Sequence, residues 1–287
     1  MNYQYHIRIN LYRGLFLFTF GTLLASSCVR PRTGMVSMAP EQQRHEVAGS
    51  AFLSISSSLA GFEIPNCVRG IEPSHVLQRE GYTVGYSDEL RIPLWAAWQL
   101  TADETYGDVP RDGGFYEDSS VPFPRAQNAD YRGSVWSRGH MAPAGDMKWS
   151  AGAMHESCLL TNVCPQDRNL NQNDWETVES RTRIWARKYG SAYVVCGPLF
   201  MNTPVRRIGD NGVAVPDAFF KVILVNDEKW QSIAFVFQNI PDRQYPKDRV
   251  CLVDDVEDMT GYDFFSMLPD EIEVAIEGTV DFSFWSI

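Results

Sequence analysis

The feature of this sequence that most constrains its fold is one long amphipathic segment set among short runs of strand-forming residues. Within residues 171–189, large apolar or β-branched side chains recur every three or four positions, which is the period of an α-helix. The members of this stripe are Trp175, Val178, Thr182, Trp185 and Tyr189. A long helix among such runs indicates a mixed α+β domain.

Several other segments predict strands, because they are rich in β-branched and aromatic residues and are bounded by Gly, Pro, Asp or Asn. They are residues 82–86, 93–100, 192–196, 219–225 and 232–237. A shorter helix is expected over residues 260–267. No internal repeat and no linker-like break follows residue 62, so we expect one domain over residues 62–287, with an antiparallel sheet.

The first residues read as a secretory signal. Arg8 and Arg13 give a positive start, and no acidic residue precedes Glu41. The apolar run over residues 14–25 is far shorter than the roughly 20 residues needed to span a bilayer, and it is typical of a signal peptide. We therefore expect residues 1–28 to act as an export signal.

The signal ends in a pattern that resembles the lipobox of bacterial lipoproteins. Small residues, Ser26 and Ser27, directly precede Cys28. This favours a lipid anchor on Cys28, although Ala25 stands where a large aliphatic residue is usual, and plain cleavage stays open. Residues 29–61, with scattered Pro, Gly and Ser, are expected to be a flexible tether. The expected location is the bacterial cell envelope, either membrane-anchored or periplasmic and secreted.

Export implies an oxidising compartment. Five cysteines remain after Cys28, which allows at most two disulfides and leaves one thiol free. Their pairing cannot be read from the sequence.

Composition and charge limit the class of protein. The chain has 287 residues, of which 44% are hydrophobic and 13% aromatic, which excludes a disordered chain. The net charge of −11 argues against a nucleic-acid partner. However, residues 125–188 hold nine basic against seven acidic residues, whereas residues 240–287 hold three against twelve. The central segment can therefore still face phosphate, and a solvated helix face explains the same counts.

The central segment also contains a group of residues suited to phosphate chemistry. Arg138, Gly139 and His140 are consecutive. A guanidinium is a planar fork that matches phosphate oxygens, and an imidazole is a base near neutral pH. The tripeptide alone is common by chance. It is followed by LTNVCPQ at residues 160–166, LNQNDW at residues 170–175, and Glu179.

These elements, in this order and spacing, resemble the DNA/RNA non-specific endonuclease family of ββα-metal (His-Me finger) nucleases. The similarity extends over about residues 70–275. It implies an α+β fold with a ββα-metal core inside a larger antiparallel sheet flanked by helices. It also implies a metal-dependent endonuclease that hydrolyses DNA and RNA and leaves 5′-phosphate ends, with Mg²⁺ or Mn²⁺ as cofactor.

The resemblance assigns roles to individual residues. It implies that His140 is the general base and that Asn171 is the protein ligand of the metal. Glu179 would accept hydrogen bonds from waters around the ion. Simpler interpretations exist: Asn171 can cap the following helix, and Glu179 can pair with Arg183 one helical turn away.

The resemblance further places Arg138 and Asn162 near the scissile phosphate, where Arg138 would neutralise developing charge and Asn162 would orient the phosphate or the base. Arg111 is a looser match to an upstream phosphate-binding arginine, and an ordinary loop arginine explains it equally well. The main departure is Ser137, where the family most often has Asp; its effect on rate and metal preference stays open.

Two other functions remain open from the sequence. One is a non-catalytic envelope lipoprotein that keeps the fold as a binding module. The other is a metal-dependent phosphodiesterase or nucleotidase that acts on small substrates. The oligomeric state and the preference between DNA and RNA cannot be read from the sequence.

Overall fold

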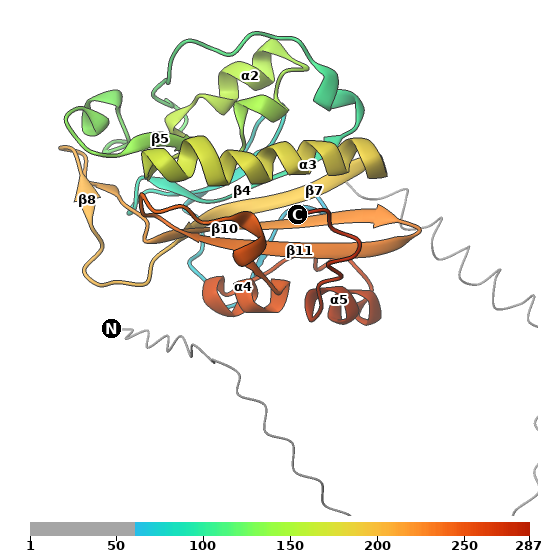
Figure 1. The fold of residues 1–287 in the computed structure, drawn as a ribbon. Helices are drawn as coiled ribbons and strands as arrows, with labels where there is room; N and C mark the ends of the chain where they lie inside the picture. Colours follow the sequence, from blue (N-terminus) through green and yellow to red (C-terminus); the bar gives the residue numbers. More distant parts are fainter. Residues whose placement is uncertain (1–60) are drawn as a thin grey trace, which may run out of the picture. The chain divides into compact units, whose positions relative to one another are not determined.

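The fold is built on a seven-stranded sheet in which every neighbouring pair of strands is antiparallel (Figure 1). The structure is a computed structural model that describes residues 61–287. The strand order is β12-β11-β10-β7-β4-β3-β2. These strands are β2 (His75–Gln78), β3 (Thr83–Ser87), β4 (Ile92–Thr101), β7 (Ser191–Leu199), β10 (Ala218–Asp227), β11 (Lys229–Gln238) and β12 (Val250–Cys251).

All five predicted strand segments are confirmed, as β3, β4, β7, β10 and β11, with ends that differ by one to a few residues. The strand β10 is buried along nearly its whole length. Apart from Lys221, its first eight residues are apolar, because the sheet is covered on both faces and neither side of the strand meets water.

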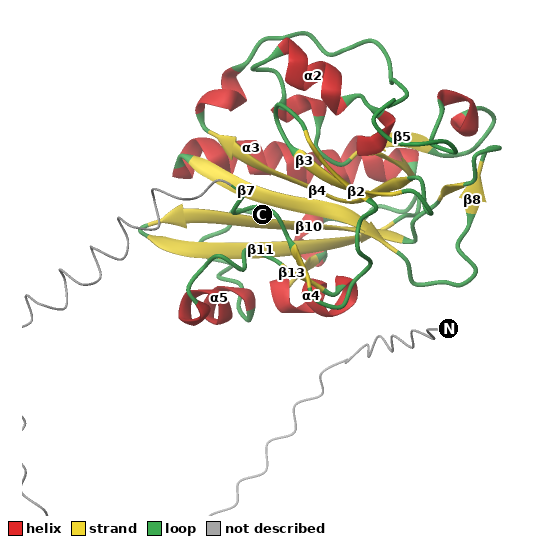
Figure 2. Cartoon of the chain, turned by 180° about the vertical axis from the view of Figure 1, so that it is seen from behind, coloured by secondary structure: helices red, strands yellow, loops and turns green. Residues whose placement is uncertain are grey.

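Helices cover both faces of the sheet (Figures 1 and 2). On one face, α3 (Glu176–Tyr189) packs on β4, β7 and β10, and α2 (Ala151–Ser157) lies on the same side. On the other face, α4 (Val253–Thr260) and α5 (Asp270–Glu277) pack on β11. The predicted long helix is therefore confirmed, although its first turn, Leu170–Trp175, is a π-helix.

The predicted helix over residues 260–267 is wrong. The helix α4 ends at Thr260, because Gly261 takes a left-handed conformation with φ of 73° that glycine adopts without strain. The chain then forms β13 (Tyr262–Asp263), which pairs with β1 (Asn66–Cys67). The helices α2, α4 and α5 were not predicted.

Aromatic side chains fill the core on both sides of the sheet. Between the sheet and α3, the Trp175 ring packs against Phe219 and Phe237, with centroids 5.8 and 6.1 Å apart. On the opposite face, Phe220 packs against Phe264 at 5.6 Å. Neighbouring residues of β10 thus point to opposite faces and join both layers to one sheet.

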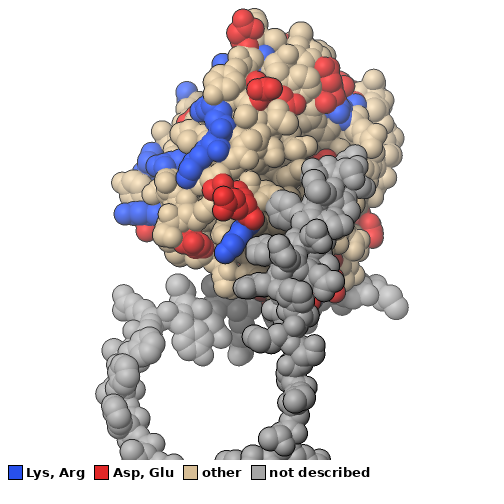
Figure 3. All heavy atoms as spheres, turned by 90° about the vertical axis from the view of Figure 1, so that its right-hand side faces the viewer, with Lys and Arg blue, Asp and Glu red and all other residues tan. Residues whose placement is uncertain are grey.

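Charge is unevenly spread over the surface. Figure 3 looks onto the end of the molecule at the right of Figure 1, and Lys and Arg side chains gather along one flank of that face. The helix α3 has two basic residues, Arg187 and Lys188, in its last turn. In contrast, α4 and α5 together carry no basic residue and many acidic ones.

The expected signal over residues 1–28 and nearly all of the expected tether lie outside the described residues. Among residues 61–287, no helix combines the length and the apolar character needed to cross a bilayer. None of the five cysteines in this range is in a disulfide, and Cys158, Cys164 and Cys196 are buried.

Candidate active site

The residues with candidate chemistry lie on a small hairpin followed by a helix, which is a ββα unit (Figure 1). The strand β5 (Ser137–His140) pairs antiparallel with β6 (Val163–Gln166), and the π-turn and α3 follow. In this register Arg138 lies opposite Pro165 and His140 opposite Val163. The pairing brings the motif at residues 138–140 next to the motif at residues 160–166. The chain that leaves β6 then leads into the third motif, at residues 170–175.

The glycine between Arg138 and His140 is required by close packing. A Cβ atom on Gly139 would lie only 2.0 Å from Oε1 of Gln166, whose side chain is fully buried against it. A larger residue here would push the two strands apart. Gly139 of the first motif and Gln166 of the second thus pack directly against each other.

Arg138 and His140 are two positions apart on β5 and point to the same face of the hairpin. Phe115 contacts both: its ring centroid lies 4.8 Å from the His140 ring and 4.8 Å from the Arg138 guanidinium carbon. Arg138 also donates a hydrogen bond to Oδ1 of Asn128. One aromatic ring therefore fixes a cation and an imidazole side by side.

His140 is held in its neutral form. Burial first, and then the positive charge of Arg111, lower the pKa of His140 to about 3. The imidazole is 7% exposed, and its Nε2 lies 3.8 Å from Sγ of Cys158. Arg111 itself is exposed. The charge of Arg111 thus acts on His140, and its role in phosphate binding stays a prediction.

Asn171 is oriented by Ser137. Its Nδ2 donates to Oγ of Ser137 over 3.2 Å, and the Ser137 hydroxyl donates to the main-chain oxygen of Gln166 over 2.7 Å. Because a serine hydroxyl has one hydrogen, which Gln166 takes, its oxygen can only accept from Asn171. In the described part of the chain no hydrogen bond ends on Oδ1 of Asn171, so this oxygen is available to a metal ion.

Asn171 does not cap the helix, contrary to the simpler interpretation. It lies inside the π-turn, and the main-chain N–H groups of Asn169 and Leu170 bond instead to Oδ1 of Asp167, over 2.7 and 3.3 Å. Single π-turns in helices are often found at functional sites. The turn gives Asn171 a position beside β5.

Glu179 faces a buried lysine. Nζ of Lys221, which is 1% exposed, lies 3.7 Å from Oε1 of Glu179, and the Glu179 side chain is 12% exposed. Burial raises the pKa of Glu179 to about 7, although the Lys221 charge opposes this rise. The suggested ion pair between Glu179 and Arg183 is not among the ion pairs of residues 61–287. Arg183 pairs with Asp146 over 2.8 Å instead.

Asn162 is bonded to the main chain close to His140. It is fully buried, and its carboxamide is used by the main chain: Oδ1 accepts from the N–H of Ala142, and Nδ2 donates to the oxygens of Ala142 and Ser157. These contacts are 2.8 to 2.9 Å long. Asn162 therefore positions the segment that follows His140, which is compatible with its predicted part in orienting the base, and its buried carboxamide is already bonded to the main chain rather than free for the phosphate.

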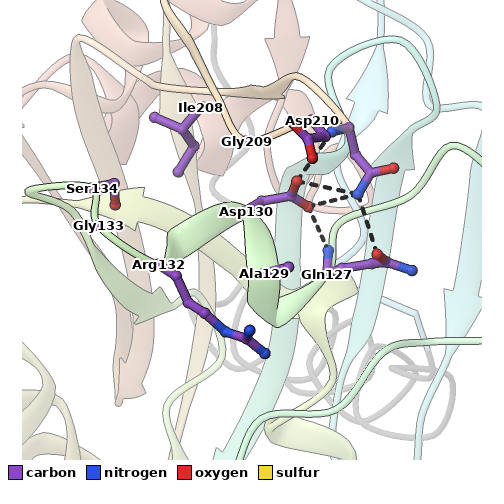
Figure 4. Close-up of a pocket in the computed structure, with 10 residues that line it drawn as sticks. Gln127, Ala129, Asp130, Arg132, Gly133, Ser134, Ile208, Gly209 and Asp210 are labelled. Atoms are coloured by element: carbon purple, nitrogen blue, oxygen red, sulfur yellow. Dashed lines mark hydrogen bonds between the residues drawn. The ribbon is translucent and has the colours of Figure 1, made fainter.

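A pocket of about 380 Å³ lies beside the hairpin, and His140 and Asn171 do not line it (Figure 4). Its walls come from residues 127–134 and from residues 208–211. The second segment begins at the end of β8 (Arg207–Ile208) and leads toward β9 (Val213–Ala214). The Asp130 carboxylate holds the walls together, since it accepts hydrogen bonds from Gln127 and Asn211. These hydrogen bonds thus stabilise the segment that leads into β5.

Three residues of this site were not predicted. Phe115 lies in a loop with no recognisable pattern. Asp146 and Lys221 become neighbours of Glu179 only through the fold, although a lysine inside the apolar run of β10 was a usable signal.

The sequence and the fold of this chain are similar to those of known nucleases. The family model of DNA/RNA non-specific endonucleases matches residues 68–271. Human mitochondrial endonuclease G is 38% identical over 198 residues, covering 64% of this chain and 67% of the human protein. Nuclease C1 of Cunninghamella echinulata is 36% identical over 230 residues, covering 74% of this chain and 89% of that nuclease.

A solved structure of an EndoG/EndoGI complex gives a TM-score of 0.65 at 31% identity, and covers 71% of this chain and 89% of that chain. The chain spans 53% of bovine endonuclease G and 57% of the Xenopus laevis nuclease EXOG. It therefore corresponds to about half to two thirds of these mitochondrial relatives. The match covers the hairpin, the π-turn and α3, and the predicted ββα-metal fold is confirmed. The chain belongs to the DNA/RNA non-specific endonuclease family, a family of metal-dependent nucleases.

Proposed function

We propose that this protein is a Mg²⁺-dependent endonuclease that hydrolyses phosphodiester bonds in DNA and RNA and leaves 5′-phosphate ends. The observation that carries the proposal is the arrangement on one face of β5. A neutral imidazole and a guanidinium are fixed by the same Phe115 ring, and the charge of Arg111 acts on that imidazole. Family membership supports the same reaction.

His140 takes the role of general base. In the tautomer in which Nε2 carries the hydrogen and donates to Sγ of Cys158, Nδ1 has the lone pair that accepts a proton from the attacking water. The free site keeps the imidazole unprotonated at neutral pH, so its lone pair is available. A bound phosphate offsets the charge of Arg111 and makes the imidazole more basic when the proton is transferred.

Arg138 and Arg111 bind the phosphate. Arg138 lies beside His140 and can present two N–H groups to phosphate oxygens, stabilising the negative charge that develops there. Contacts to phosphates carry no base information, which fits cleavage without sequence preference.

The residues present fit a magnesium ion. Mg²⁺ prefers oxygen ligands and retains several waters, so one carboxamide oxygen is a sufficient protein ligand. Oδ1 of Asn171 is the candidate, because Ser137 occupies the amide nitrogen. When bound, the ion would supply Lewis-acid stabilisation of the phosphate and of the departing 3′ oxygen.

We further propose export to the bacterial cell envelope, with Cys28 lipidated. This rests on the sequence of residues 1–28 alone.

The test of the activity is cleavage of plasmid DNA and of an RNA polymer with Mg²⁺. We expect cleavage that stops with EDTA and falls by about 10²–10⁴-fold in His140→Ala. The matched control is His75→Ala, because His75 pairs with Asp88 away from β5. Unchanged cleavage by His140→Ala would refute the assignment of the base. A wild-type protein that binds polymer without cleaving it would favour the non-catalytic binding module. Cleavage confined to small phosphodiesters would favour the phosphodiesterase or nucleotidase.

A further inference from the structure

Carboxylates from α4 and α5 converge on the face of the sheet opposite to α3. Asp254 and Glu257 come from α4, and Glu277 comes from α5. One carboxylate oxygen from each lies within 4.8 Å of the other two. Figures 1 and 2 both show the two helices side by side on this face, away from β5.

Glu277 is the unusual member of this group. It is only 4% exposed, and its Oε1 has no hydrogen-bond partner within residues 61–287. A buried carboxylate that is neither paired nor hydrogen-bonded is costly. None of the ion pairs formed by the described residues includes Asp254, Glu257 or Glu277.

The charged neighbours of Glu277 make this cost larger. The charges of Glu257, Glu273, Asp254 and Asp263 all act on the Glu277 carboxylate. Every charge in that set is negative. A buried carboxylate with such neighbours needs either a proton or a cation to be stable.

The spacing of the oxygens fits a cation. Two oxygens that bind the same Ca²⁺ at about 2.3–2.6 Å can be at most about 5 Å apart, and the three carboxylates meet this limit. Their burial is also graded: Glu277 forms a buried floor, Glu257 is half-buried and Asp254 is exposed. An ion can therefore enter from the side of Asp254 and keep waters there. The ligands come from two different helices. Such a set suits Ca²⁺, which tolerates varied coordination geometry, better than Mg²⁺, which requires a near-regular octahedron.

We propose that Asp254, Glu257 and Glu277 form a second divalent-cation site of the Ca²⁺ class. This site is separate from the one proposed at Asn171, and an ion bound there would join α4 to α5. The ion would fix the C-terminal helix to the sheet, together with the hydrogen bond of 2.7 Å from Oγ of Ser232 to the main-chain oxygen of Ile276. This site is independent of the proposed nuclease reaction.

The test compares thermal unfolding of the full chain in EDTA and in CaCl₂, with calorimetric titration of Ca²⁺. The background variant is Asn171→Ala, so that binding at the proposed active site does not contribute. We expect Ca²⁺ to raise Tm in this background, and Glu277→Gln to abolish that rise and weaken Ca²⁺ binding by at least about tenfold, since one of three charged ligands is lost. In EDTA, Glu277→Gln is expected to unfold at the same or a higher temperature, because repulsion is removed.

Two further variants complete the test. Glu271→Gln lies on α5 but is exposed and outside the cluster, so it should keep the full Ca²⁺ response. Asp254→Asn changes an exposed ligand and should weaken the response even if Glu277→Gln does not fold. The proposal is overturned if Ca²⁺ does not raise Tm, if Mg²⁺ alone does so, or if Asp254→Asn responds like the background. A higher Tm of Glu277→Gln in EDTA, together with no rise of Tm when Ca²⁺ is added to the background protein, would show that protons stabilise the cluster, and would also overturn the proposal.

Discussion

Removal of the Ser137 hydroxyl should weaken metal binding without removing any metal ligand. The Asn171 carboxamide is oriented by one hydrogen bond of 3.2 Å to this hydroxyl. A hydrogen bond of this kind contributes about 1 kcal/mol net. In Ser137→Ala the amide can rotate and present its nitrogen to the ion, so we expect Mg²⁺ affinity to fall by about fivefold, which is the factor that about 1 kcal/mol represents.

The assay is plasmid cleavage as a function of Mg²⁺ concentration, together with calorimetric titration of Mg²⁺. We expect half-saturation to shift to higher Mg²⁺, while the rate at saturating Mg²⁺ stays close to that of the wild type. Ser137→Asp should retain the orientation of Asn171, because a carboxylate accepts from its nitrogen, and so should bind Mg²⁺ at least as tightly as the wild type. Ser134→Ala is the control, since its hydroxyl bonds to Tyr131 and not to Asn171. Unchanged half-saturation in Ser137→Ala would refute this orientation argument.

The other predictions concern the surroundings of His140. Arg111→Ala removes a positive charge that lowers the pKa of His140, so this pKa should rise, and the acid limb of the kcat/KM profile should move to higher pH. Arg111→Lys should keep the wild-type limb, and identical profiles for all three proteins would contradict the electrostatic argument. Asn162→Ala removes three buried hydrogen bonds and should lower the free energy of unfolding by about 3 kcal/mol. Thermal denaturation should then show a Tm about 6–12 °C lower, whereas the exposed Asn202→Ala should leave Tm unchanged; an unaltered Tm in Asn162→Ala would show that these bonds do not stabilise the fold.

The strands and the long helix were predictable because their signals are local. Strand segments such as residues 219–225 are largely apolar runs bounded by turn residues, and the helical stripe repeats over about four turns. The short acidic helices α4 and α5 have eight residues each, too few for periodicity to be clear. A start signal was nevertheless present for α5, where Pro269 precedes an acidic first turn.

The site was predictable in its motifs but not in its contacts. Arg138, His140 and Asn171 were found because each lies in a short motif. Phe115, which contacts Arg138 and His140, and Lys221, which faces Glu179, were missed because they are distant in sequence from these motifs. The role of Asn162 was also set by the fold: its neighbours, Ala142 and Ser157, appear only when β5 and α2 are in place.

The pair of Lys221 and Glu179 shows why the missed residues matter for the site as a whole. Lys221 sits in the middle of β10, and its ammonium lies 4.3 Å from the Trp175 ring centroid and 3.7 Å from Glu179. It therefore contacts Trp175 at the end of the π-turn and Glu179 in the first turn of α3. A buried ammonium can be retained only where a carboxylate and aromatic faces replace water, so the sheet and the helix are held at one fixed register. Because Asn171 lies in that same π-turn, the register that this pair sets at the core also decides where the candidate metal ligand lies beside β5.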